Sequence, residues 1–367
     1  MQTIINGFDT DIFSKNFLKS YNVSKYLLVC DSAFEFLSVK SVFEDGGVPF
    51  VKFDSFSPNP VYEDVVKGVE LFRGSECCAI VAVGGGSSID VAKCIKLYSA
   101  MDPSECYIGQ EFKDAGVPLA AVPSTAGTGS ESTRHAVIYY KGEKQSISHD
   151  SIVPDVAFLE PDVLETLPLY QKKCTLLDAL GQGIESWWSV NSNGESAVYS
   201  EKTVKMICEN IDDYIFKNTP ESREKIMEGA NFSGRAINIT QTTAAHAMSY
   251  KLSSLYGLPH GHAVALCLPK VWRYMLENTE KCSDPRGKEH LEKVFADIAS
   301  AMGEKTAEEA LEKFERIFEK LEMSYPDGKK DDIALLAASV NPVRLKNNPV
   351  ALDSETLFKM YAQIVNI

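Results

Sequence analysis

The chain has 367 residues, enough for two or three domains of ordinary size, and its 44% hydrophobic content can fill hydrophobic cores. Its formal net charge of −14 argues against nucleic-acid binding, because no basic stripe is available to neutralise phosphates. No run of about eighteen apolar residues, no signal-peptide pattern and no Cys-x-x-Cys pair is found, so we expect a cytoplasmic protein with reduced thiols and no membrane partner.

The first 160 residues alternate strand-like apolar runs with helical stretches. The strand-like runs are Tyr26–Cys30, Val48–Phe53, Ile80–Val83 and Leu119–Val122. This alternation predicts parallel strands with crossover helices, an arrangement in which ligands bind beyond the carboxyl ends of the strands.

A glycine turn follows the third of these runs and leads into a helix. Such a turn presents backbone N–H groups and the positive end of the helix dipole to phosphate oxygens. A lone glycine cluster is a weak signal, and an ordinary turn without function is the alternative. The candidate cofactor-binding residues of this segment are Gly84, Gly85, Gly86, Ser87 and Asp90.

A second polar turn, at residues 123–131, follows the apolar run Val117–Val122. We expect it to bring hydroxyl and N–H groups to the same ligand as the glycine turn. It adds four candidate cofactor-binding residues, Ser124, Thr125, Thr128 and Ser130.

From Pro161 onward the apolar residues recur with helical spacing, as in Ala197–Asn210, Leu291–Met302 and Thr306–Leu321. The sequence therefore predicts a domain boundary near Pro161, with an α/β nucleotide-binding domain at 1–160 and an all-helical domain at 161–367.

Asp178, His246 and His260 are spaced as a divalent-metal site requires. Carboxylate and neutral imidazole hold zinc or ferrous iron while leaving a position open for substrate. Such a metal polarises an aldehyde carbonyl or stabilises an alkoxide. The alternative for each histidine is a buried side chain that only satisfies hydrogen bonds.

The order of these motifs resembles that of the iron-activated, metal-dependent alcohol dehydrogenases, over roughly Asn6 to Pro349. The motifs are Gly-Gly-Gly-Ser, Ser-Thr-Ala-Gly-Thr-Gly-Ser-Glu, Pro-Asp-Val-Ala-Phe-Leu-Glu-Pro, Leu-Asp-Ala-Leu, His-Ala-Met and Leu-Pro-His-Gly. The resemblance implies the dehydroquinate synthase-like fold: an N-terminal dinucleotide-binding α/β domain and an all-α C-terminal domain. It also implies NAD(H) and one divalent metal (Fe²⁺, Zn²⁺ or Mn²⁺) in the cleft between the domains, and a homodimer or larger homo-oligomer.

The resemblance places Asp31, at the end of the run Tyr26–Cys30, against the adenosine ribose. A carboxylate there accepts hydrogen bonds from both ribose hydroxyls and repels a 2′-phosphate, which favours NAD over NADP. The alternative is an aspartate that only caps the next helix. Lys144 matches the family lysine that approaches the nicotinamide-side ribose.

Gln182 stands where the resemblance expects a fourth metal ligand, a histidine four residues after Asp178 on the same helical face. An amide oxygen is a weaker, neutral donor. Three alternatives are open: Gln182 Oε1 ligates, water replaces it, or the metal is bound too weakly for steady occupancy.

Tyr250 stands where the family often has a proton-relay histidine, four residues after His246. A phenol with a pKa of about 10 relays protons poorly at neutral pH. His262 is the alternative relay, and it is equally read as a plain core histidine.

The segment Ser339–Val350 is the one that addresses substrate class, through Arg344, Lys346, Asn347 and Asn348. Guanidinium, ammonium and amide donors suit a sulfonate, phosphonate or carboxylate, although a solvated turn is the alternative. We take Arg344, Lys346 and Asn348 as candidate substrate ligands. Together with Glu185–Asn193 and Ser249–Tyr256, the segment resembles the family branch that reduces sulfoacetaldehyde to isethionate or phosphonoacetaldehyde to 2-hydroxyethylphosphonate.

The sequence thus predicts NADH-dependent reduction of a small anionic aldehyde, in which a metal held by Asp178, His246 and His260 stabilises the developing alkoxide. Sulfoacetaldehyde is favoured slightly, because a phosphonate dianion asks for more cations than Arg344 and Lys346. Phosphonoacetaldehyde reduction and general alcohol dehydrogenation are alternatives. A dehydroquinate synthase-like lyase and a non-catalytic dinucleotide sensor are less favoured.

Overall fold

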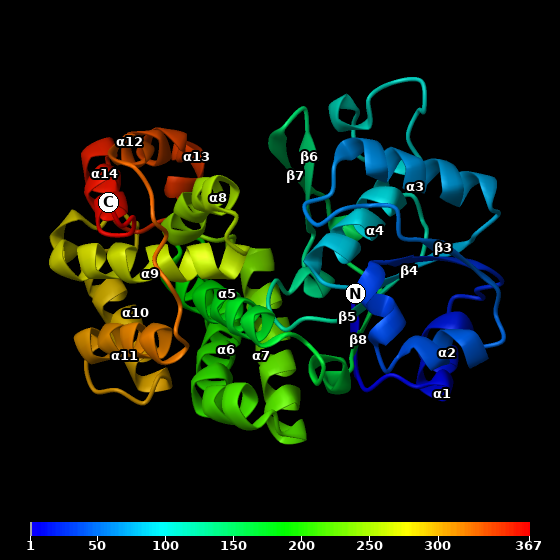
Figure 1. Ribbon diagram of the computed structural model, residues 1–367, viewed down its shortest axis with the longest axis horizontal. Helices are drawn as coiled ribbons and strands as arrows, with labels where there is room; N and C mark the ends of the chain where they lie inside the picture. The colour runs from blue at the N-terminus through cyan, green and yellow to red at the C-terminus, as the bar shows by residue number, and fades with distance from the viewer. Residues whose placement is uncertain (1) are drawn as a thin grey trace. The chain divides into compact units, whose positions relative to one another are not determined.

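In a computed structural model that describes residues 2–367, the chain forms two compact units, Met1–Leu167 and Pro168–Ile367 (Figure 1). The boundary lies beyond the one predicted near Pro161. The short helix η6 (Pro161–Leu164), with Val163 and Leu164 buried, continues the first unit past its last strand.

The first unit is built on a six-stranded parallel sheet with strand order β1-β8-β5-β4-β2-β3. The predicted parallel sheet is confirmed, and the four predicted strands correspond to β2 to β5. The sequence did not predict β1, β8 or the antiparallel hairpin β6–β7, whose turn has positive φ at Lys141 and Gly142. The strands are β1 (Thr3–Asn6), β2 (Tyr26–Cys30), β3 (Phe50–Phe53), β4 (Ala79–Gly84), β5 (Leu119–Pro123), β6 (His135–Tyr140), β7 (Glu143–Ser148) and β8 (Val156–Leu159).

Helices cover this sheet, and alternate strand residues point to opposite faces. On one face, Leu27 and Ile80 belong to a core shared with α3 and α4. On the other, Tyr26 and Phe158 contact Phe13 edge to face. The helices of this unit are α1 (Thr10–Phe13), η1 (Ser14–Leu18), η2 (Ser32–Phe36), α2 (Lys40–Asp45), α3 (Tyr62–Gly74), α4 (Gly86–Tyr98), η3 (Tyr107–Gly109), η4 (Ser130–Ser132), η5 (Asp150–Ile152) and η6.

The strand order reverses direction between β2 and β4. The chain runs from β2 outward to β3, then returns to β4 on the other side of β2. Because Cys30 pairs with Val83, both strands end at the same level, at Asp31 and Gly84. Ligands of open α/β sheets bind at such a switch point, beyond the carboxyl ends of the strands.

The second unit is all-helical, as predicted, and its central helix is α5 (Leu169–Trp188), which packs against α6, α7 and α9 (Figure 1). Trp188 contacts Trp272 and Phe295 edge to face in the core. The predicted helices near 197–210, 291–302 and 306–321 correspond to α6, α10 and α11. The other bounds are α6 (Gly194–Asp212), η7 (Asp213–Lys217), α7 (Pro220–Thr240), α8 (Ala244–Tyr256), α9 (His260–Glu277), η8 (Thr279–Lys281), α10 (Lys288–Ala301), α11 (Ala307–Lys320), α12 (Lys330–Ser339), α13 (Pro342–Leu345) and α14 (Ser354–Ala362).

Within residues 2–367, none of the helices combines the length and apolarity that a bilayer crossing requires. All nine cysteines are free thiols.

Candidate active site

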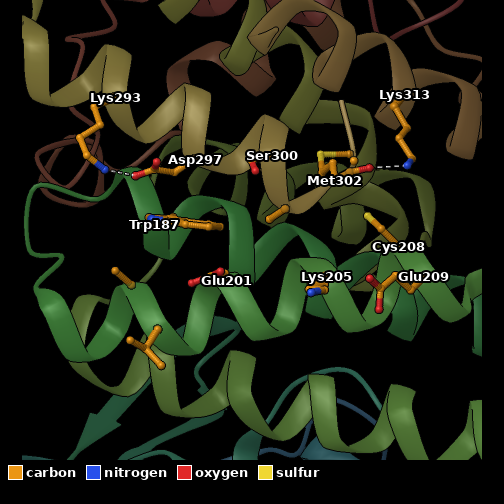
Figure 2. Close-up of a pocket in the computed structure, with 14 residues that line it drawn as sticks. Trp187, Glu201, Lys205, Cys208, Glu209, Lys293, Asp297, Ser300, Met302 and Lys313 are labelled. Carbon is orange, nitrogen blue, oxygen red and sulfur yellow. Dashed lines mark hydrogen bonds and ion pairs between the residues drawn. The ribbon is translucent and has the colours of Figure 1, made fainter. Parts of the chain in front are cut away.

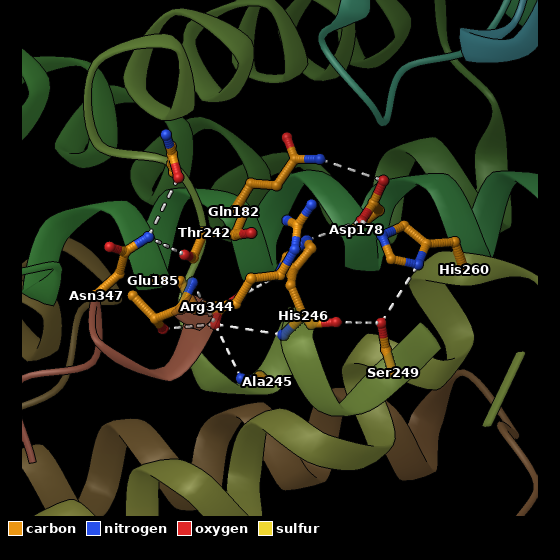
Figure 3. A network of polar contacts seen from close by, with 12 residues as sticks. Asp178, Gln182, Glu185, Thr242, Ala245, His246, Ser249, His260, Arg344 and Asn347 are labelled. Carbon is orange, nitrogen blue, oxygen red and sulfur yellow. Dashed lines mark hydrogen bonds and ion pairs between the residues drawn. The ribbon is translucent and has the colours of Figure 1, made fainter. Parts of the chain in front are cut away.

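Asp178, His246 and His260 converge in the helical unit, as predicted, from α5, α8 and the first residue of α9 (Figure 3). Nε2 of His246 lies 3.3 Å from Oδ1 of Asp178, and Nε2 of His260 lies 3.9 Å from the same oxygen. In a tetrahedral zinc site with bonds of about 2.0–2.2 Å, ligand atoms lie roughly 3.4 Å apart. The three side chains therefore already have the spacing of ligands around a single ion.

The chemistry of this cluster fits a divalent cation. Asp178 and His246 are almost fully buried, and Nε2 of His246, beside Oδ1 of Asp178, has no hydrogen bond to another atom of residues 2–367. Burial lowers the pKa of His246, but the neighbouring Glu185 and Asp178 carboxylates outweigh this and raise it to about 9. The site thus favours positive charge at Nε2, which either a proton or a metal ion supplies.

Gly261 explains how His260 comes so close to Asp178. A Cβ at this position would lie 2.0 Å from the backbone oxygen of Cys174 and 2.8 Å from Cβ of Asp178. Only glycine therefore allows the start of α9 to approach α5 at the level of the aspartate.

Glu185, on α5, holds the His246 imidazole from the far side. Its Oε2 contacts Nδ1 of His246, and its Oε1 accepts hydrogen bonds from the Thr243 hydroxyl (2.6 Å) and the Ala245 N–H (3.0 Å) at the start of α8. Metal-ligating histidines commonly bond a carboxylate in this way, which fixes the ring and leaves Nε2 as the ligand atom. Glu185 was not predicted as a site residue, although it follows Asp178 by seven positions and two helical turns place both on one face.

Gln182, which lies one turn after Asp178, is oriented with its nitrogen toward the carboxylate. Its Nε2 lies 3.3 Å from Oδ2 of Asp178, and its Oε1 accepts a hydrogen bond from the Ser233 hydroxyl at 2.9 Å. The oxygen that would ligate a metal therefore faces α7.

Tyr250 lies beside the triad, whereas both ring nitrogens of His262 contact other groups. The Tyr250 ring stacks on His260 with centroids 5.6 Å apart, and burial raises the pKa of its phenol, which weakens it as a proton relay. His262 is buried, its Nδ1 contacts the Tyr170 hydroxyl and its Nε2 contacts the backbone oxygen of Ser324, both at 2.8 Å. Both ring nitrogens of His262 thus have hydrogen-bond partners away from the triad, and a relay role for His262 stays a prediction.

Of the three predicted substrate ligands, Arg344 is the one that contacts Tyr250, the neighbour of the triad. Its guanidinium lies 5.2 Å from the centroid of the Tyr250 ring and donates to the phenol oxygen at 3.1 Å. Lys346 is exposed to solvent. Asn348 is buried, and its amide donates to the Val350 carbonyl at 2.7 Å, so it stabilises its own turn and its role as a substrate ligand stays a prediction.

Asp31 has a double role at the switch point of the first unit. Its Oδ1 caps η2 by accepting the Ala33 N–H at 2.9 Å, and its Oδ2 accepts the Ser88 hydroxyl at 3.2 Å. The capping alternative is therefore observed, and the same carboxylate also reaches the glycine turn.

The two predicted cofactor loops lie side by side. Gly84 has a φ of +148°, and a Cβ there would lie 2.3 Å from the Ser88 hydroxyl, so this position requires glycine. A Cβ on Gly86 would lie 2.9 Å from Thr128. The loops thus contact each other through glycine backbone and leave N–H groups at the start of α4. Gly85 precedes α4 and Ser87 lies in its first turn, whereas Ser124 and Thr125 follow β5, and the Ser124 N–H donates to the Gly84 carbonyl at 2.9 Å.

Asp90, predicted as a cofactor ligand, anchors the second loop. Its two oxygens accept the Ser130 hydroxyl at 2.6 Å and the Val137 N–H at 2.9 Å. Lys93, fully buried, donates to the same Ser130 hydroxyl oxygen at 3.0 Å. Burial raises the pKa of Asp90, against the charges of Lys93 and of Lys144, which lies in β7. Asp90 and Ser130 therefore hold the loop in place, and their contact with the cofactor stays a prediction.

A separate cavity of about 740 Å³ lies in the helical unit (Figure 2). Residues of α5, α6, α10 and α11 line it, among them Trp187, Cys208 and the ion pair of Lys293 with Asp297. Its lining contains none of the predicted site residues, so the triad and this cavity are distinct.

Comparisons with known proteins agree with this arrangement. The family model described as iron-containing alcohol dehydrogenase matches residues 3–161, and the model of the C-terminal part of the Fe-containing alcohol dehydrogenase family matches residues 173–365. Phosphonoacetaldehyde reductase of Streptomyces viridochromogenes is 33% identical over 77% of this chain and 75% of its own length. For 1,3-propanediol dehydrogenase of Citrobacter freundii the identity is 32%, over 71% of this chain and 66% of that protein. The crystal structure of sulfoacetaldehyde reductase from Bifidobacterium kashiwanohense with NAD⁺ superposes with a TM-score of 0.88 at 25% identity, covering 99% of this chain and 96% of the other.

Proposed function

Because the chain belongs to the iron-containing alcohol dehydrogenase family, and is therefore an NAD-dependent, metal-containing oxidoreductase, we propose that it reduces a small aldehyde with an anionic head group. The first candidate is sulfoacetaldehyde, which yields isethionate. One observation carries this proposal: the guanidinium of Arg344 lies over Tyr250, whose ring stacks on the triad residue His260.

The stack places a permanent positive charge two ring contacts from the candidate metal ligands. The Arg344 guanidinium is 5.2 Å from the Tyr250 centroid, which is 5.6 Å from that of His260. A two-carbon aldehyde with a sulfonate or phosphonate carries its charge close to its carbonyl, so a cation near the triad is what such a head group requires. Arginine is suited to this task because its planar donors match the oxygens of such a head group.

The segment that carries Arg344 is fixed to the helices around it. Nδ2 of Asn347 donates to the Thr242 carbonyl at 3.1 Å, and the Val190 N–H donates to the Asn347 carbonyl at 3.1 Å. Asn191 donates to Oδ1 of Asn347 at 3.1 Å. A guanidinium held in this way orients a charged substrate with little loss of loop entropy.

When bound, NADH supplies the hydride and the divalent metal polarises the carbonyl. Asp178, His246 and His260 would hold the metal, Glu185 orients His246, and the Ser249 hydroxyl lies 3.3 Å from Nδ1 of His260. Arg344 would bind the head group and Tyr250 would separate it from His260. Because the raised pKa of Tyr250 makes it a weak acid, the proton for the alcohol comes from solvent.

Phosphonoacetaldehyde is the second candidate, favoured by the Streptomyces viridochromogenes relative. A phosphonate carries nearly two charges at neutral pH and asks for more than one cation. Arg344 has contacts with the surroundings of the triad, whereas Lys346 is exposed, which supports the singly charged sulfonate.

The test is NADH oxidation by the metal-loaded protein with sulfoacetaldehyde, phosphonoacetaldehyde, succinic semialdehyde and propanal, with metal analysis of the same sample. We expect the highest kcat/KM with sulfoacetaldehyde. Equal kcat/KM for propanal and the anionic aldehydes would reduce the proposal to general alcohol dehydrogenation. Turnover without net NADH consumption would instead support a dehydroquinate synthase-like lyase, which uses and regenerates NAD within one turnover.

A further inference from the structure

We propose that Gln182 is a positioning residue that donates a hydrogen bond to Asp178, and that the metal has three protein ligands, Asp178, His246 and His260. The inference rests on a metal-dependent reaction at this site, but not on which aldehyde is reduced. Gln182 stands at the position of the family's fourth metal ligand, and in this proposal it orients Asp178 instead of binding the metal.

The two oxygens of Asp178 face different neighbours. Oδ1 faces Nε2 of both His246, at 3.3 Å, and His260, at 3.9 Å, whereas Oδ2 faces Nε2 of Gln182 at 3.3 Å (Figure 3). The two imidazoles that would hold the metal therefore face Oδ1 of Asp178. The Gln182 amide lies against the other oxygen, where it favours one-oxygen coordination by the aspartate.

Ser233 fixes the far end of the amide. Its hydroxyl is 2.9 Å from Oε1 of Gln182, and both side chains are buried. The Ser233 hydroxyl also lies 2.7 Å from the Ala230 carbonyl, and its single proton can go to only one of the two oxygens. If the proton goes to Ala230, the hydroxyl can accept from a Gln182 amide in the reversed orientation, with its nitrogen toward Ser233. A reversed amide would bring its oxygen against Oδ2 of Asp178, and two oxygens at that distance repel each other unless a cation lies between them.

Three protein ligands and one open position are common in catalytic zinc sites, so a site without the fourth protein ligand can still hold a metal and bind a substrate. An amide that donates to Oδ2 of the aspartate stabilises the charged form of the carboxylate and fixes its rotamer. Gln182 therefore compensates for the lost imidazole by orienting a ligand.

The experiment is titration of the metal-free protein with Co²⁺, whose visible bands report the ligand set without any substrate. Gln182→Leu removes the amide, and Gln182→His introduces an imidazole as a positive control for a fourth ligand. We expect Gln182→Leu to bind Co²⁺ about 10- to 100-fold more weakly, the range for loss of a residue that orients a ligand. Its band positions should match those of the unchanged protein, while those of Gln182→His should move.

Bands of Gln182→Leu that move away from those of the unchanged protein would show that the amide oxygen ligates and would overturn the proposal. An unchanged affinity would overturn the positioning role. Ser233→Ala provides a second test that keeps Gln182: weaker binding with unmoved bands is expected, and moved bands contradict it. Because no aldehyde is present, a failed substrate proposal leaves these outcomes unaffected.

Discussion

The candidate site of the first unit is built mainly from backbone, whereas that of the second unit is built from side chains. At the switch point of the first unit, glycine backbone forms the contacts between loops, and side chains such as Asp90 and Ser130 bond mainly to one another. In the second unit, Asp178, His246 and His260 bring their own functional atoms together from three helices. The comparison teaches that a single side chain matters far more for chemistry in the helical site than in the nucleotide loops.

The strongest test of this contrast is His260→Ala, which removes one candidate ligand. We expect a loss of several kcal/mol in transition-state stabilisation, because the metal is lost or displaced. The measurement is kcat/KM together with bound metal after dialysis. His290→Ala, a histidine on α10 outside the triad, is the matched control and should retain both. Full activity in metal-free protein would contradict the assignment.

Arg344→Ala should have the next largest effect, confined to charged substrates. It removes a charge-assisted pair of about 1.5–3 kcal/mol, roughly a ten- to hundredfold rise in KM for sulfoacetaldehyde. Propanal, which has no head group, should be reduced as before. Arg344→Lys should recover part of the loss, and Lys346→Ala, at an exposed position, should change little. If both aldehydes suffer equally from Arg344→Ala, the segment is structural.

Glu185→Gln tests whether the helical site depends on orientation as well as on ligands. The amide can still accept from the Thr243 hydroxyl and the Ala245 N–H, but it presents N–H to His246 Nδ1 where a carboxylate stood. We expect metal affinity to fall about 10- to 100-fold, measured by competition with a chromogenic chelator. Glu195→Gln, at the exposed start of α6, is the control. Unchanged affinity would show that the carboxylate only caps α8.

The same contrast decides what the sequence predicted well. The strand, glycine turn and helix at residues 79–98 are local, and their pattern predicted β4, α4 and the position of the neighbouring loop. The triad was predicted because its residue types are those of a metal site and match a family, not because spacing shows proximity. Glu185 was missed although its helical spacing from Asp178 was visible.

The positions of two predicted residues, His262 and Asn348, have simple physical causes. His262 follows His260 by two residues, and since α9 begins at His260, a turn of about 200° places His262 on the opposite face of the helix. That consequence depends on where the helix starts, which the sequence did not define. Asn348 was grouped with Arg344 by proximity, yet the turn after α13 directs its amide inward to Val350.

The smallest expected effect is in the first unit, where Asp31 should set the preference for NADH over NADPH. Asp31→Gly should narrow that preference, but it also removes the cap on η2, since Oδ1 accepts the Ala33 N–H. Asp31→Asn is the cleaner change, because it keeps a capping oxygen and removes the charge. Repulsion between charges about 4 Å apart in water is about 1 kcal/mol, so the ratio of kcat/KM values should narrow roughly fivefold. Steady-state kinetics with both cofactors check this. Equal use of the two by the unchanged protein would mean that Asp31 serves only the cap and the Ser88 contact, and the switch point would then select its cofactor through backbone alone.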